Sequence, residues 1–198
     1  WGHSVDVYER DIKPGGLLRY GIPNMKLDKK LVETRIQLME EAGVNFICDT
    51  DVGNDVSYDE LDEKYDAVII AIGARKQRDL KLEGRQSRDI RFAMDYLTDQ
   101  TKVQLKEQDS PAISAKDKHV VVIGGGDTGA DCVAMALREG CKSIFQLNKY
   151  DRLPDEIEGN PSWPLEKKTF KLDYSHAEYQ NKFGVEPRAY GCLLYTSD

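Results

Sequence analysis

Regularly spaced glycines in the second half of the chain form the pattern best suited to chemistry. Gly124, Gly126 and Gly129 follow the apolar run 119–123 and precede a stretch of helical periodicity at 130–138. In a loop of this spacing the first glycine permits a tight turn, the second lets a pyrophosphate approach the backbone, and the third lets helix and strand pack closely. The start of the helix offers free N–H groups to the phosphates. A plain strand-to-helix turn is the alternative, and the complete context favours a dinucleotide site.

The residues after the next predicted strand, 143–147, bear on which dinucleotide is bound. An acidic residue about 20 positions after the glycine loop normally binds the ribose of NAD. Here Asn148 and Lys149 follow the strand, so no carboxylate occupies that place. Lys149 and Arg152 could instead accept the 2′-phosphate of NADP. The sequence therefore favours NADP, and the alternative is that both cations are solvated surface residues.

A second candidate lies near the start of the chain. A predicted strand at 4–8 ends in Glu9, and Gly15 and Gly16 follow in a loop. A carboxylate that ends the second strand of a dinucleotide fold binds the adenosine ribose. The glycine loop of such a fold would lie about 20 residues before Glu9, so we expect the chain to be a piece of a longer protein. Without the surrounding pattern, the sequence would indicate only a solvated carboxylate at the end of a strand for Glu9.

The elements between these two regions alternate strand and helix. Asp28 is the predicted N-cap of a helix that ends at Gly43, and a strand at 44–48 follows. Residues 57–63 predict a short capped helix or a turn. The apolar run 67–71 is typical of a strand buried in a parallel sheet. This alternation favours an α/β fold.

Composition excludes several classes of function. The net charge is −7, and no Lys/Arg cluster alternates with aromatic residues, which argues against a nucleic-acid groove. No apolar run approaches the roughly 20 residues that span a bilayer. The four cysteines form no C-x-x-C pair, so we expect no zinc site, redox disulfide or iron-sulfur cluster in this segment. Reduced thiols predict a cytoplasmic protein.

Motifs along most of the chain resemble a known family. They are Glu9, the stretch 15–23 (GGLLRYGIP), 71–74 (AIGA), 78–80 (RDL) and 124–129 (GGGDTG). In this order they resemble the small subunit of NADPH-dependent glutamate synthase, to about residue 190. The reductase portion of dihydropyrimidine dehydrogenase and the NADPH-ferredoxin reductases share this plan, which leaves the electron acceptor open.

The resemblance implies FAD in the first fold and NADPH in the second. Glu9 then matches the ligand of the FAD ribose, Gly16 and Leu17 match the loop beside the FAD pyrophosphate, and Gly73 matches the crossover between the folds. The residues that match the NADPH pyrophosphate loop are Gly124, Gly126, Asp127, Thr128 and Gly129.

The expected architecture is α/β, with two Rossmann-like dinucleotide-binding lobes. Residues 1–82 are the partial FAD lobe, 83–118 the connecting segment with a helix near 92–97, 119–190 the incomplete NADPH lobe and 191–198 an unassigned tail.

The implied activity is oxidoreduction, in which electrons pass from NADPH through FAD to a partner. That partner is the large subunit of glutamate synthase, which forms glutamate from glutamine and 2-oxoglutarate, or another acceptor. No acid-base residue is required because the cofactors carry the chemistry. Iron-sulfur clusters are expected only in an upstream segment outside the chain. The alternatives are an NADPH-ferredoxin or dihydropyrimidine dehydrogenase type of reductase module, and a non-catalytic nucleotide-binding fragment.

Overall fold

The computed structural model describes residues 2–74, 76–81, 83–156 and 169–192. The chain divides into two compact units, the first ending at Asp79 and the second beginning at Leu80. Each unit carries its own parallel sheet with helices, as predicted for an α/β fold.

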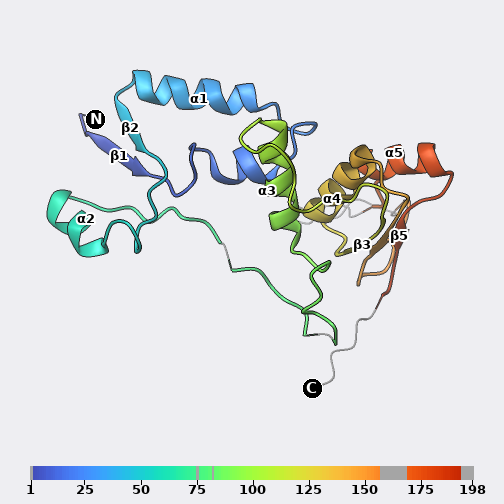
Figure 1. The fold of residues 1–198 in the computed structure, drawn as a ribbon. Helices are drawn as coiled ribbons and strands as arrows, with labels where there is room; N and C mark the ends of the chain where they lie inside the picture. The colour runs from blue at the N-terminus through green and yellow to red at the C-terminus, as the bar shows by residue number, and fades with distance from the viewer. Residues whose placement is uncertain (1, 75, 82, 157–168, 193–198) are drawn as a thin grey trace. The chain divides into compact units, whose positions relative to one another are not determined.

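The first unit is built on a strand-helix-strand motif (Figure 1). Strand β1 (Val5–Tyr8) pairs in parallel with β2 (Val44–Ile47), and helix α1 (Lys29–Glu41) lies between them in the chain. Asp28 begins the helix, since its side chain accepts a hydrogen bond from the Lys30 N–H at 2.9 Å. Gly43 follows the helix with φ +92°, a conformation that favours glycine. The predicted cap and helix end are confirmed.

Two short helical elements complete this unit. The π-helical turn η1 spans Leu17–Gly21, and α2 spans Tyr58–Lys64. Ser57 and Glu60 form a capping box at the start of α2, in which each side chain bonds the other residue's backbone N–H. This confirms the short capped helix predicted from sequence.

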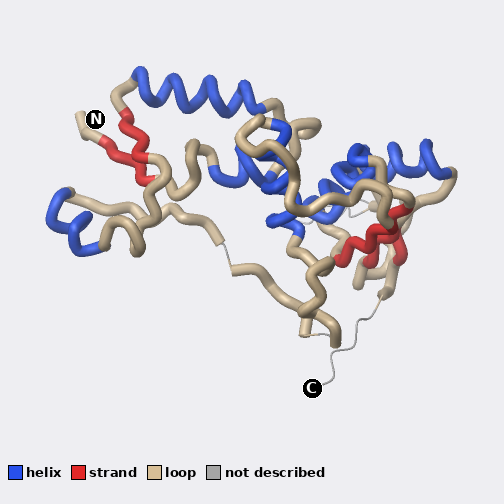
Figure 2. The backbone as a smooth tube through the Cα atoms, viewed as in Figure 1, coloured by secondary structure: helices blue, strands red, loops and turns tan. Residues whose placement is uncertain are grey.

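The strand predicted at 67–71 is wrong. These residues form no strand, and the run is drawn as loop in Figure 2. Ile69 and Ile70 are 88% and 69% exposed. An apolar run becomes a strand only where a neighbouring strand supplies backbone partners and a layer covers its side chains. Within the described residues of this unit, the only paired strands are β1 and β2.

The second unit holds a three-stranded parallel sheet in the order β3-β4-β5. The strands are β3 (His119–Ile123), β4 (Ser143–Leu147) and β5 (Arg188–Ala189). Helix α4 (Asp127–Glu139) connects β3 to β4, and α5 (Tyr174–Phe183) precedes β5. Figure 1 shows both helices beside this sheet. The succession of β3, the glycine loop, α4 and β4 confirms the predicted Rossmann-like unit.

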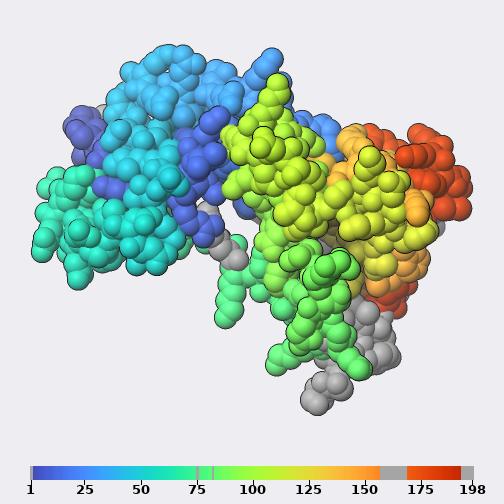
Figure 3. All heavy atoms as spheres, in the orientation of Figure 1, coloured from blue at the N-terminus to red at the C-terminus, as the bar shows by residue number. Residues whose placement is uncertain are grey.

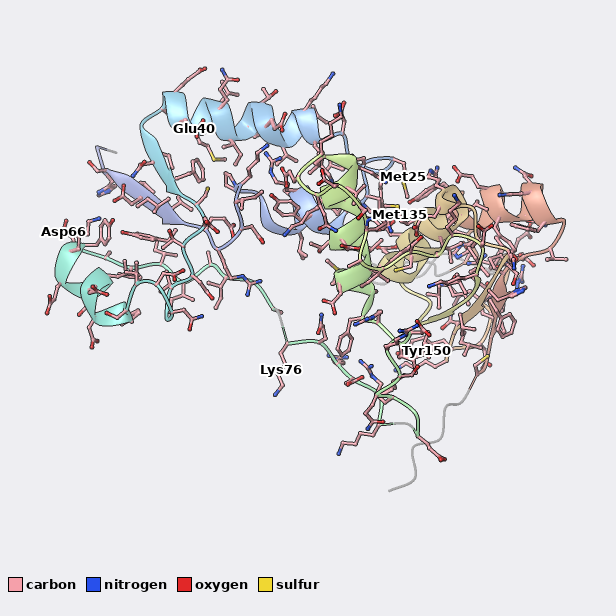
Figure 4. The ribbon with its side chains drawn as sticks, viewed as in Figure 1. Met25, Glu40, Asp66, Lys76, Met135 and Tyr150 are labelled. Carbon is pink, nitrogen blue, oxygen red and sulfur yellow. The ribbon has the colours of Figure 1, made fainter. Side chains whose placement is uncertain are left out.

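Helix α4 is the centre of the packing in the second unit. Val133, Ala134 and Ala136 are fully buried, and α4 contacts β3, β4, α5 and α3 (Ala93–Gln104). Small side chains allow this close approach on several sides. Met135, labelled in Figure 4, is 1% exposed, and its sulfur accepts a hydrogen bond from the Gln104 side chain of α3 at 3.4 Å.

The segment predicted to connect the lobes belongs to the second unit, where α3 is fixed by the carboxylate of Glu139 on α4. Oε1 accepts from Gln100 Nε2 at 2.9 Å and from Ser114 Oγ at 2.7 Å. Oε2 accepts from the Tyr96 hydroxyl and from the Ala115 N–H. Figure 3 draws this segment as green to yellow-green spheres. Among the residues that the structure describes, no helix is long and apolar enough to cross a membrane.

Candidate functional site

The glycine loop joins β3 to α4 at the carboxyl edge of the sheet. Gly124 has φ +123°, and its N–H donates to the Leu147 carbonyl of β4 at 2.9 Å. Gly126 is the N-cap of α4 and makes no side-chain capping bond. The first loop-to-helix bond runs from the Ala130 N–H to the Gly126 carbonyl at 3.0 Å. The N–H groups before Ala130 thus stand at the helix start with no side-chain cap, where an anion can accept from them.

The third glycine packs as the sequence predicts. A Cβ atom on Gly129 would overlap the carbonyl oxygen of Gly124 and would lie 2.7 Å from Nε2 of Gln146. A side chain is therefore excluded at position 129. Gly126, in contrast, has open space where its Cβ would be. We call residues 124–129 the glycine cradle. It combines tightly packed backbone at Gly129 with open backbone at Gly126, and it fits a pyrophosphate group.

A contact that sequence reasoning missed joins the loop to the end of β4. A Cβ atom on Gly125 would overlap the side-chain amide of Asn148. Asn148 follows the last residue of β4, at the place where an NAD-binding fold carries its ribose carboxylate. Its Oδ1 accepts from the Tyr150 N–H at 3.1 Å, and Tyr150 is labelled in Figure 4.

The two cations proposed for a 2′-phosphate lie in the loop that follows β4. Nζ of Lys149 lies 4.8 Å from the ring centroid of Tyr150. Arg152 pairs with both carboxylate oxygens of Asp155, at 2.7 and 3.1 Å, and its guanidinium lies 3.8 Å from the Phe170 ring centroid. The hydrogen bonds from Arg152 lower the pKa of Asp155. Arg152 is thus already paired with a carboxylate that a phosphate would have to share or displace.

The candidates of the first unit lie on separate elements. Glu9 follows β1, and its Oε1 accepts from the Asp11 N–H at 3.0 Å. Gly16, with φ +48°, is the N-cap of η1, and Leu17 begins that turn with 66% of its surface exposed. Gly73 is exposed with φ +68°. All four residues belong to the first unit, whereas the glycine loop belongs to the second.

Buried polar residues of α4 have structural partners. Asp131 accepts a hydrogen bond from the Tyr174 hydroxyl at 3.1 Å. Burial, and then the charge of Asp131, raise the pKa of the Cys132 thiol to about 12. A thiol with this pKa is neutral and unreactive at neutral pH. Within the described ranges, no three His, Cys, Asp or Glu residues gather as metal ligands do.

Residues 7–158 match the family of pyridine nucleotide-disulphide oxidoreductases. The chain belongs to this family. This chain is 51% identical over 191 residues to the glutamate synthase [NADPH] small chain of Bacillus subtilis (strain 168), covering 96% of this chain and 39% of that relative. It is 48% identical over 196 residues to the glutamate synthase [NADH] of Schizosaccharomyces pombe, covering 97% of this chain and 9% of the relative.

A solved structure has a similar fold. Mycobacterium tuberculosis FprA in complex with NADPH superposes with a TM-score of 0.61 at 25% identity, covering 75% of this chain and 37% of FprA. These likenesses confirm the predicted resemblance and the fold class. The chain spans about two-fifths of the Bacillus subtilis relative, 39% of its length.

Sequence reasoning missed three residues of the candidate site, namely Gly125, Gln146 and His176. Gln146 and His176 are 0% and 2% exposed and lie behind the glycine loop. A polar residue inside the apolar run of β4 was the available signal for Gln146, because buried side-chain amides need partners. No sequence signal indicated His176, because no helix was predicted at the position of α5.

Proposed function

We propose that the chain is part of a flavoprotein reductase that passes electrons from NADPH through FAD to a partner for glutamate synthesis. The glycine cradle at the start of α4 carries this proposal. Gly129 packs on the Gly124 carbonyl, while the amides at the helix start have no side-chain cap. This arrangement suits the pyrophosphate of a dinucleotide.

The NADPH lobe is assigned to residues 119–190. Bound NADPH would supply a hydride, and this chain would hold and orient the nucleotide. In this proposal the loop Gly124, Gly126 and Gly129, with Asp127 and Thr128 in the first turn of α4, binds the pyrophosphate. Asn148 stands where a ribose carboxylate would repel a 2′-phosphate, and the cations that follow it would attract one.

The partial FAD lobe is assigned to residues 1–82, joined to the NADPH lobe by residues 83–118. Glu9, at the end of β1, would bind the adenosine ribose of FAD. Gly16 and Leu17 would line its pyrophosphate, and Gly73 would belong to the crossover. Residues 191–198 have no assigned role.

The partner and location are proposed from the relatives. Three bacterial relatives from Bacillus, Mycobacterium and Azospirillum are glutamate synthase [NADPH] small chains, a name that implies a large chain. We therefore assign the large subunit as partner, a cytoplasmic location, and iron-sulfur clusters to an upstream segment of the whole protein.

Calorimetric titration with NADPH and with NADH tests the nucleotide site. We expect saturable binding of NADPH, weaker binding of NADH, and competition by NADP⁺. Absence of binding by a folded chain would remove the proposed function. Flavin absorbance and flavin reduction are measured separately. The chain alone should be a poor reductase, because it supplies only part of the proposed FAD site. Hydride transfer needs the nicotinamide ring and the flavin ring held in contact. Stoichiometric FAD with steady turnover would refute this expectation.

The second candidate is an NADPH-ferredoxin type of reductase, a family that shares the motifs of this chain. FprA from Mycobacterium tuberculosis, solved in complex with NADPH, supports the NADPH side of this candidate at a TM-score of 0.61. A dihydropyrimidine dehydrogenase type of module shares the same donor side. Electron transfer from the whole protein to ferredoxin, compared with transfer to a glutamate synthase large chain, separates these functions. A non-catalytic module would bind NADPH and reduce neither acceptor.

A further inference from the structure

A buried glutamine of the sheet holds the glycine loop by its backbone. Gln146 lies in β4 beside Val122 of β3 and is 0% exposed. Its side-chain Nε2 donates to the Gly124 carbonyl oxygen at 2.7 Å. This bond crosses from the second strand to the loop that follows the first.

A histidine on α5 fixes which way that amide faces. Nε2 of His176 lies 2.6 Å from Oε1 of Gln146. Because the Gln146 NH₂ group must donate to the Gly124 carbonyl, its oxygen faces the histidine, and His176 must donate. The proton of the neutral ring is therefore on Nε2. Nδ1 is buried and makes no hydrogen bond.

The bond determines the orientation of the peptide between Gly124 and Gly125. In a planar trans peptide the carbonyl oxygen and the following N–H point in opposite directions. Since the Gly124 carbonyl is drawn toward Gln146, the Gly125 N–H must point away from that buried amide. Gly125 is itself exposed. Gln146 thus selects one of two orientations of a peptide flanked by glycine on both sides.

Such selection is needed because the loop has little intrinsic preference. Residues 124–126 are consecutive glycines, which have the widest range of backbone conformations and lose the most entropy on ordering. Gly129 supports the same carbonyl, since a Cβ there would overlap it. The Gly124 oxygen is thus held between the Gln146 amide and the Gly129 backbone.

We propose that Gln146 and His176 are positioning residues that preset the Gly124–Gly125 peptide for binding the pyrophosphate of the nicotinamide dinucleotide. This inference rests on the proposed function for its ligand. It predicts that the pair acts on phosphate binding and leaves recognition of the adenosine end unchanged.

The test uses the full chain and two probes. NADP⁺ contains the pyrophosphate, whereas adenosine 2′-monophosphate keeps the adenosine and 2′-phosphate and has no 5′-phosphate. Gln146→Leu should weaken NADP⁺ binding about tenfold, because the Gly124 carbonyl loses its donor and the loop must be ordered on binding. Binding of adenosine 2′-monophosphate should change less than twofold. Amide hydrogen exchange of residues 124–129 should become faster in the nucleotide-free chain.

Substitutions at His176 separate positioning from packing. His176→Leu should weaken NADP⁺ about threefold, because Gln146 loses the donor that holds its oxygen. His176→Gln can donate to the same oxygen and should restore most of the affinity.

Tyr179→Phe is the matched control. Its hydroxyl accepts from the Ile144 N–H at 3.0 Å, within the same contact of α5 with β4. The variant therefore removes a buried hydrogen bond of similar kind without touching the loop. Its stability should fall while loop exchange and NADP⁺ affinity stay unchanged.

Two results would overturn the inference. In one, the amide exchange of residues 124–129 and the NADP⁺ affinity are the same in Gln146→Leu as in Tyr179→Phe. In the other, both probes weaken equally, which marks a general loss of packing. Equal affinities for the two His176 variants would remove the role of the histidine. If the unaltered chain binds no NADP⁺, the proposed function fails, and the exchange comparison still decides whether Gln146 orders the loop.

Discussion

Replacement of Gly129 by alanine tests the packing of the glycine cradle most directly. The added Cβ would overlap the Gly124 carbonyl oxygen and lie 2.7 Å from the Gln146 Nε2. Both neighbours are constrained, since one is backbone and the other is the amide of a fully buried side chain. The loop must therefore move away from α4, and the Gln146 bond to Gly124 must lengthen or break.

The expected cost follows from three contributions. Overpacking in a closed site costs about 1–3 kcal/mol, and a lost hydrogen bond adds about 1 kcal/mol. Position 129 lies in the first turn of α4, where alanine in place of glycine returns up to about 1 kcal/mol of helix propensity. The net loss is about 2 kcal/mol, which lowers the melting temperature of a unit of this size by roughly 8 °C.

Gly126→Ala is the control for this prediction. The Cβ at position 126 would meet no atom within 4 Å, and φ is −86°, which any residue adopts. Its melting temperature should therefore stay within about 2 °C of the unaltered chain. NADPH affinity should still fall, because the added methyl group blocks the approach of the pyrophosphate to the backbone.

Differential scanning calorimetry and NADPH titration of both variants complete the test. We expect Gly129→Ala to lose stability and affinity together, and Gly126→Ala to lose affinity alone. Equal melting temperatures for the two variants would refute the packing argument. Full affinity in Gly126→Ala would refute the assignment of the second glycine.

Four further predictions follow from single contacts. Replacing Lys149 and Arg152 together by alanine should weaken NADPH roughly tenfold or more while NADH changes little, and equal losses in titrations would remove the 2′-phosphate assignment. Asp155→Asn should strengthen NADPH about twofold to fivefold, because it removes the carboxylate that pairs with Arg152; an unchanged dissociation constant would count against competition. Burial, and then a neighbouring arginine, lower the pKa of Lys29 to about 8. The unfolded chain then holds the proton that the folded chain releases, so stability should rise between about pH 8 and pH 10.5, and urea unfolding should show a shallower rise in Lys29→Met. Cys132 should react with iodoacetamide last among the cysteines, since burial raises the pKa of its thiol to about 12, and rapid labelling in the folded chain, read by mass spectrometry, would contradict that burial.

The region around the glycine loop was predictable because local and tertiary signals agree there. The apolar run 119–123 became β3, and Gly140 ends α4 in the left-handed conformation, with φ +87°. Asp28 caps α1 for the same reason, since capping depends on residues only a few positions apart. Short-range patterns of this kind can be read from the sequence directly.

Other features depend on contacts that no local pattern contains. The run 67–71 has strand composition, and the described residues supply it with no strand partner. Helix α5, which begins after Asp173 and ends at Gly184, was not predicted, and β5 spans just Arg188–Ala189. The hydrogen bond from His176 to Gln146 joins residues 30 positions apart, and only the packing of α5 on the sheet brings them together.

The contact between Gly125 and Asn148 affects how nucleotide preference can change in evolution. Asparagine and aspartate have nearly the same shape, so a carboxylate at position 148 would occupy the space that Gly125 already leaves open. In the proposed site, one substitution would therefore place a negative charge beside the ribose without repacking the loop. Both NADPH and NADH glutamate synthases occur among proteins about half identical to this chain, at 51% and 48%. In the proposed site, the glycines thus set the shape of the loop, while residue 148 sets the charge beside the ribose.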